Sequence, residues 1–226
     1  MNFKIDGKTI SDIIIGLSDG LTVPFALAAG LAGAIAQSHI VLVGGLAELA
    51  AGGISMGLGG YLAAKSEGDT YVAELQREQR EIEDCPDEEV DEVRQILVGY
   101  GLQDEALQGA VHGIIANRQG WALFMMKEEL GLEQPDPRQA LKTALFIGGA
   151  YLVGGSVPLS PYAFGLPVQT AFYLSVGVTS VALLVFGAVK GRFTSVPLVK
   201  SSLETFMVGS LAAAAAYLLA RLVGGH

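Results

Sequence analysis

Two carboxylic acids and a thioether lie inside long apolar stretches, where an ionised side chain is costly. Asp19 falls within Ile13–Ala36, and Glu48 and Met56 fall within Ile40–Ala64. A carboxylate inside a membrane usually belongs to an ion path or a proton relay, and the alternative is a protonated carboxyl hydrogen-bonded between helices. A thioether favours transition metals, although packing alone is a sufficient reason for Met56. The three residues are candidates for a metal translocation path.

The depths of these residues follow from the helical rise. At about 1.5 Å per residue, Asp19 lies about 9 Å and Met56 about 12 Å from the same end of an antiparallel pair of spans, so they can form one site. Glu48 lies about 12 Å deeper than Met56. Pro24 cannot donate to the carbonyl of Gly20, so that oxygen is a further candidate ligand beside Asp19. The alternative is a simple kink.

An acidic segment, residues 65–138, holds a second group of candidate ligands. It contains 18 acidic and 7 basic residues, whereas the whole chain has a net charge of −9. Carboxylates recur there at spacings of three and four residues, which place them on one helix face. These carboxylates and the nearby thioethers are Glu78, Glu81, Glu89, Glu92, Glu128, Glu129, Met125 and Met126.

Three helices that gather these side chains would bind a divalent cation, which offsets the repulsion between carboxylates. Oxygen ligands alone suit Ca²⁺, Mg²⁺ or Mn²⁺, and thioether sulfur shifts the preference towards softer transition metals. The alternative is an acidic face exposed to solvent.

The composition indicates a membrane protein. Hydrophobic residues make up 51% of the 226-residue chain and charged residues 16%, whereas a soluble domain usually has about 25% charged residues. The 30 glycines favour close helix packing. The negative net charge argues against a nucleic-acid partner. The single cysteine, Cys85, excludes an internal disulfide and a CxxC metal site.

The sequence also argues against an enzyme. Gly53–Gly57 matches the G-x-S-x-G motif of serine hydrolases, but it lies in a predicted membrane helix instead of a strand-to-helix elbow, and no histidine is expected at that depth. The Glu-x-x-His pairs of ferritin-like di-iron proteins do not occur in the sequence. We therefore expect no catalytic residues and no permanently bound cofactor.

Five apolar stretches can cross a bilayer core, which takes about 20 residues. After the first two come Leu141–Val157, Val168–Val189 and Leu198–Val223. We predict an all-α membrane protein with five transmembrane helices and a cytosolic three-helix metal-binding insert between the second and third. The predicted division is 1–64 for the N-terminal segment and two spans, 65–138 for the insert, and 139–226 for the last three spans.

Proline, glycine and asparagine mark the helix ends expected in the insert. The second span is expected to continue as a helix until a proline, which lacks a backbone donor and suits a first helical turn. The expected breaks are Asp84-Cys85-Pro86, Gly101 and Gly131, which leave Asp87–Tyr100 and Asp104–Leu130 as the second and third helices. An interruption of the third helix at Asn117–Gly120 is the alternative to one continuous helix.

The basic residues predict the orientation. The N-terminus carries Lys4 and Lys8, and the connection between the fourth and fifth spans carries Lys190, Arg192 and Lys200. Residues 37–39 and 158–167 contain no Lys or Arg. The positive-inside rule then places the N-terminus and the insert in the cytosol and the C-terminus on the far side.

Taken together, these features resemble the vacuolar iron transporter family, especially its plant members. They are Ser18-Asp19-Gly20 with Pro24, Glu48, Gly53-Ile54-Ser55-Met56-Gly57, and Tyr61-Leu62-Ala63-Ala64-Lys65 before the acidic insert. The resemblance extends from Asp12 to about Val223. It implies a homodimer in the vacuolar membrane that moves Fe²⁺ from the cytosol into the vacuole in exchange for H⁺.

The resemblance also assigns residues by position. It places the family's metal-binding residues on Glu78, Glu81, Glu89, Glu92, Met125 and Glu129, and its translocation residues on Asp19, Glu48 and Met56. Mn²⁺ is a second candidate cargo, and other divalent transition metals are candidate ligands of the insert.

Two hypotheses follow for the function. The first is a proton-coupled exporter of Fe²⁺ from the cytosol. The second is a membrane-anchored protein that binds or senses divalent metals without transport. The carboxylates inside the first two spans distinguish them, because a sensor has no need of an acid inside the membrane.

Overall fold

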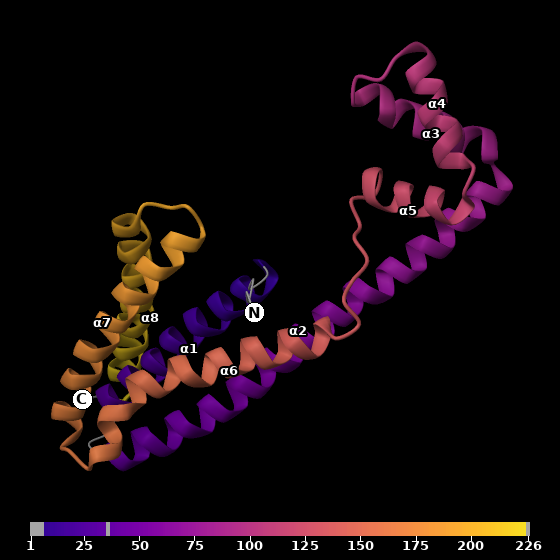
Figure 1. Cartoon of the computed structure of the whole chain (residues 1–226). Helices are drawn as coiled ribbons and strands as arrows, with labels where there is room; N and C mark the ends of the chain where they lie inside the picture. Colours follow the sequence, from indigo (N-terminus) through magenta and orange to yellow (C-terminus); the bar gives the residue numbers. More distant parts are fainter. Residues whose placement is uncertain (1–6, 35–36, 225–226) are drawn as a thin grey trace, which may run out of the picture. The chain divides into compact units, whose positions relative to one another are not determined.

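The computed structural model describes residues 7–34 and 37–224, which form helices and no strand (Figure 1). The helices are α1 (Gly7–Ala34), α2 (Ser38–Asp84), α3 (Pro86–Gly99), α4 (Asp104–Ile115), α5 (Arg118–Glu128), α6 (Gln139–Leu159), the 3₁₀ helix η1 (Ser160–Phe164), α7 (Val168–Phe193) and α8 (Leu198–Gly224). The all-α prediction is confirmed. Two residues of the predictions lie outside the described residues: Lys4, and Ala36 at the predicted end of the first span.

The chain divides into two compact units. The membrane unit consists of the described parts of Met1–Leu62 and Ala140–His226, and the insert unit consists of Ala63–Gln139. Helix α2 contributes to both, because its 47 residues continue past the apolar stretch until Asp84. The predicted insert, 65–138, lies within the insert unit.

Five helices among the described residues are long and apolar enough to cross a membrane, as predicted: α1, α2, α6 with η1, α7 and α8. The third span is longer than the predicted Leu141–Val157, because α6 continues through Pro158 into η1. Pro158 is buried, and its carbonyl accepts a hydrogen bond of 2.7 Å from Ser175 of α7. That bond ties the end of α6 to the next span.

Glycines bring α1 and α2 into close contact with α6. A Cβ at Gly16 of α1 would overlap the carbonyl oxygen of Ile147, and a Cβ at Gly148 would lie 2.9 Å from the carbonyl oxygen of Gly53 of α2. A side chain at either position would force backbones apart. The spacing of Gly16 and Gly20 therefore serves packing within one chain, and it is no evidence for a dimer contact.

Pro24 lies inside α1, which continues without a break on both sides of it. The proline is buried, and a Cβ at Gly155 of α6 would meet both its ring and, at 3.2 Å, the carbonyl oxygen of Gly20. The freed carbonyl thus packs against α6. This position favours the packing interpretation of Pro24 over a role as a ligand.

The insert unit has its own hydrophobic core, built from α2, α3, α4 and α5. Its members are Ile82, Val93, Leu97, Val111, Trp121, Ala122 and Met125. Most helix ends agree with the breaks expected from the sequence, but the predicted third helix is divided at Ala116 and Asn117 into α4 and α5. Cys85 separates α2 from α3, the side chain of Asn117 caps α5 by accepting from the backbone N–H groups of Gln119 and Gly120, and Gly131 has a left-handed φ of 65° after α5.

Candidate functional site

The three predicted translocation residues lie in the membrane unit, and each is half-buried. Asp19 is on α1, and Glu48 and Met56 are on α2. Met56 packs against the hydrophobic cluster that contains Leu49 of α2 and Tyr151 of α6. The structure thus places the thioether beside the helix face where α2 meets α6.

Tyr151 links the two acids. Its side chain is 2% exposed, and its Oη donates a hydrogen bond to Oε1 of Glu48. The charges of both Glu48 and Asp19 act on this hydroxyl. Glu48 therefore contacts Tyr151 directly, Asp19 acts on its hydroxyl through its charge, and Met56 packs against the cluster to which Tyr151 belongs.

The second oxygen of Glu48 has no such partner. Its Oε2 is buried and accepts no hydrogen bond from any of the described residues. A buried carboxylate oxygen without a donor is costly, so a proton or a cation at this atom would stabilise the site. This is the chemistry that an ion path or a proton relay needs.

A third acid, Asp12 on α1, was not among the predicted site residues. Asp12 is 5% exposed, and its Oδ2 accepts a hydrogen bond of 2.8 Å from Thr143 of α6. It lies seven residues before Asp19, which places both on one face of α1. That spacing could have identified it from the sequence.

Tyr151 was missed as well. A tyrosine inside an apolar span needs a partner for its hydroxyl, so Tyr151 within Leu141–Val157 was a detectable signal. Which partner it finds depends on how α6 packs against α2, and one sequence does not give that packing.

The G-x-S-x-G match has a structural role. Gly53 and Gly57 lie in the uninterrupted helix α2, where a Cβ would meet Leu152 and the carbonyl oxygen of Ala144, respectively. A helix interior cannot form the strained turn that a nucleophilic serine requires. The motif marks the contact of α2 with α6.

The acidic residues of the insert unit gather around two buried glutamates. Glu78 of α2 is 1% exposed and Glu89 of α3 is 6% exposed, and their side chains hydrogen-bond each other. Glu81, Glu92 and Glu129 all repel Glu89. Because Glu78 and Glu89 are buried, they do not belong to an acidic face exposed to solvent.

Burial and mutual repulsion favour protonation of this cluster. Desolvation, the hydrogen bond with Glu89 and repulsion by Glu89, Glu129 and Glu81 raise the pKa of Glu78 to about 8. Burial, followed by repulsion from Glu92, also raises the pKa of Glu129, while Arg77 opposes the shift. Arg77 lies 3.3 Å from both Glu74 and Glu81 and offsets part of the repulsion.

The remaining predicted ligand, Met125, is fully buried in the core of the insert unit. Glu78 Oε1 and Glu89 Oε2 are buried, and apart from a proton shared within this pair they find no donor within the described part of the chain. Nevertheless, no three His, Cys, Asp or Glu side chains among residues 7–34 and 37–224 stand in a metal-binding arrangement. The acids are close enough to share a proton but not arranged as a ready-made site.

The fold and the buried acids define a class: a multi-span membrane protein with carboxylates inside its spans and an acidic helical insert. A model of the VIT family matches residues 10–221, so the chain belongs to the VIT family, as its resemblance to vacuolar iron transporters indicated.

Several relatives share most of the chain. It is 56% identical to Vacuolar iron transporter 1 of Tulipa gesneriana over 214 residues, which cover 95% of this chain and 87% of that protein. It is 52% identical to Vacuolar iron transporter 1 of Arabidopsis thaliana, over 96% of this chain and 87% of that protein. Protein CCC1 of Saccharomyces cerevisiae is 41% identical, over 98% of this chain and 71% of that protein.

Proposed function

We propose that this chain transports Fe²⁺ across the vacuolar membrane, from the cytosol into the vacuole, in exchange for H⁺. One observation carries the proposal: inside the membrane unit Glu48 accepts a hydrogen bond from Tyr151 through one oxygen, while its other oxygen is buried without a partner among the described residues. Asp19 acts on the same tyrosine through its charge, and Met56 packs against the cluster that contains it. The names of the plant relatives, vacuolar iron transporters, support iron as the cargo.

The donor set suits a divalent transition metal. Asp19 offers oxygen and Met56 offers sulfur, and added thioether sulfur favours Fe²⁺ over Ca²⁺ or Mg²⁺. Mn²⁺ prefers oxygen ligands and is the second candidate cargo. Glu48, with its unpartnered oxygen, would take up a proton from the acidic side and release it when a cation arrives.

The orientation follows from the basic residues. Lys190 and Arg192 end α7, Lys200 begins α8, and Lys142 lies in the first turn of α6, next to the insert. Because successive spans run in opposite directions, these helix ends and the end of the apolar stretch of α2 fall on one side of the membrane, which the positive-inside rule assigns to the cytosol. The insert would then face cytosolic metal.

We propose that the insert unit captures the metal before transport. Glu78, Glu81, Glu89, Glu92 and Glu129 lie within electrostatic range of one another. A divalent cation that displaces the proton shared by Glu78 and Glu89 would relieve this repulsion, so binding would release protons. Met125, in the core of the same unit, would supply sulfur.

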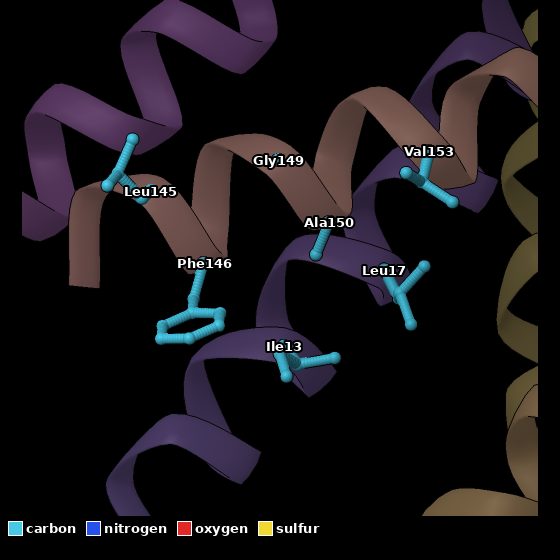
Figure 2. A pocket seen from close by; sticks show the side chains of 7 residues that line it. All are labelled: Ile13, Leu17, Leu145, Phe146, Gly149, Ala150 and Val153. Carbon is cyan, nitrogen blue, oxygen red and sulfur yellow. The ribbon is translucent and has the colours of Figure 1, made fainter. Parts of the chain in front are cut away.

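The homodimer is proposed to form along α1. An apolar groove of about 380 Å³ runs between α1 and α6, and the side chains that line it are hydrocarbon only (Figure 2). They are Ile13, Leu17, Leu145, Phe146, Gly149, Ala150 and Val153. A two-fold axis at this face would double the set of acids.

The alternative is a membrane-anchored sensor, for which the insert alone would suffice. The unpartnered oxygen of Glu48 inside the membrane unit favours transport, because an intramembrane carboxylate has no use in a sensor. An uptake assay distinguishes the two functions. It uses the purified full chain in liposomes with an acidic interior. We expect Fe²⁺ uptake well above that of empty liposomes. Fe²⁺ binding by the detergent-solubilised protein without uptake by these liposomes would support the sensor instead.

A further inference from the structure

Two glycines pack directly against Tyr151 and restrict where its ring and hydroxyl can lie. A Cβ at Gly52 would lie 2.5 Å from the Tyr151 Oη, and a Cβ at Gly20 would overlap the Tyr151 backbone. Gly52 lies one helical turn after Glu48, and Gly20 directly follows Asp19. Glycines next to both acids thus leave the space that this one tyrosine occupies.

The hydrogen bond of Tyr151 divides the Glu48 carboxyl into two unlike oxygens. Oε1 accepts from the tyrosine hydroxyl, whereas Oε2 is buried without a partner among the described residues. A phenolic hydroxyl both donates and accepts, so it can hold Oε1 whether Glu48 is ionised or protonated. Phenylalanine, which has the same ring without the oxygen, can do neither.

We propose that Tyr151 is a positioning residue of the transport cycle, which fixes Glu48 through Oε1 and leaves Oε2 as the one oxygen that exchanges its ligand. This role rests on the proposed transport function. Tyr151 contacts no cargo in this account; it acts through Glu48. Its hydroxyl keeps the carboxyl in one orientation while a proton or a cation comes and goes.

The test is Tyr151→Phe in the full chain, measured as Fe²⁺ uptake into liposomes. The ring still fills the space beside Gly20 and Gly52, while a hydrogen bond to a charged group is lost. We expect the maximal rate to fall about tenfold. The apparent KM for Fe²⁺ should stay within about twofold, because Asp19 and Met56 are unchanged.

Tyr162→Phe is the matched control. Tyr162 is also 2% exposed, but its hydroxyl is buried without a hydrogen-bond partner among the described residues, and no carboxylate acts on it. We expect this variant to transport at the wild-type rate. The two variants should remain folded to similar temperatures in detergent, which separates a positioning role from a loss of structure.

Infrared difference spectra with and without Fe²⁺ report on the Glu48 carboxyl directly, and a change in packing alone would not shift its band. A carboxyl band that Glu48→Gln abolishes should shift in Tyr151→Phe and stay in place in Tyr162→Phe. If Tyr151→Phe takes up Fe²⁺ at the wild-type rate, or if its Glu48 band does not shift, the positioning role is wrong and the transport function is unaffected. A wild-type protein without uptake would instead overturn the transport function on which this role rests.

Discussion

At the scale of single residues, the two units handle their carboxylates in different ways. Glu48 in the membrane unit accepts a hydrogen bond from a tyrosine and keeps one oxygen unpartnered. Glu78 in the insert unit instead pairs with Glu89, and burial raises its pKa to about 8. The first arrangement suits exchange at a single atom, and the second suits displacement of a shared proton by a metal.

The thioether of Met56 is testable by a change that keeps its volume. Met56→Leu replaces sulfur with carbon and usually costs less than about 1.5 kcal/mol of stability. We expect the apparent KM for Fe²⁺ to rise several-fold with little change in folding, because the softer ligand is gone. Uptake assays should show no such change for Met207→Leu, on the exposed face of α8. An unchanged KM in Met56→Leu would make Met56 a packing residue.

The buried pair in the insert predicts how stability depends on pH. The pKa of Glu78 rises from 4.5 to about 8 on folding, so between these values the folded insert binds more protons than the unfolded chain. Its stability must then fall as pH rises through this window. The fluorescence of Trp121, the single tryptophan, reports unfolding of the insert core. We expect its melting temperature to decrease as pH increases from 4.5 towards 8.

Glu78→Gln removes the titrating group from that experiment. The pH dependence of the Trp121 melting temperature should flatten in this variant and persist in Glu133→Gln, whose side chain is exposed. A melting temperature that rises with pH in the wild-type chain would mean that the buried carboxylates are ionised and paired in the folded insert.

At the scale of elements, helix packing around α6 decides where the acids lie. α6 contacts α1 through Gly16 and Gly20 and α2 through Gly52, Gly53 and Gly57. These contacts bring α1 and α2, which carry the three predicted translocation residues, against Tyr151. A small change in this packing should therefore disturb both stability and the site.

Gly16→Ala tests the contact between α1 and α6. The new methyl group would overlap the carbonyl oxygen of Ile147, a backbone atom that cannot move aside freely. Overpacking of this kind costs about 1–3 kcal/mol. Thermal unfolding in detergent should show the loss. Gly177→Ala on α7, where a Cβ meets nothing within 4 Å, should be neutral or slightly stabilising. Equal melting temperatures for the two variants would refute the contact.

The sequence predicted the elements better than their contacts. The five spans, the continuation of the second span to Asp84 and the break at Asn117 follow from apolar length, proline and capping, which are local properties. The third span was predicted too short, because a proline suggests a helix end, whereas Pro158 lies inside α6 and η1 follows directly.

The acids of the candidate site could be predicted from the sequence, but the tyrosine that holds Glu48 could not. Asp19, Glu48 and Met56 stand out because polar or soft residues are rare in apolar stretches. Tyr151 and the bond between Asp12 and Thr143 depend on which faces of α1, α2 and α6 meet, and tertiary packing sets these. The burial of Glu78 and Glu89 was hidden for the same reason, since their surroundings in the sequence are polar.

At the scale of the whole molecule, the proposed dimer is tested by crosslinking. In a Cys85→Ser background, single cysteines at Ile13 or Leu17 would line the groove between α1 and α6. We expect oxidation in membranes to trap dimers from these positions. Cysteine at Leu222, an exposed residue of α8, is the control and should not crosslink. Crosslinks from α8 alone would place the two-fold axis elsewhere.

In the proposed transport cycle, Glu48 exchanges a proton for a cation as Fe²⁺ crosses the membrane. Glu48→Gln keeps the shape and the hydrogen bond from Tyr151 but cannot titrate. The direct measurement follows Fe²⁺ uptake and internal pH together in liposomes with an acidic interior. We predict that Fe²⁺ entry and proton exit accompany each other in the wild-type protein and that both fall sharply in folded Glu48→Gln. Full uptake driven by the pH gradient in Glu48→Gln would contradict the claim and leave Glu48 as a protonated packing group.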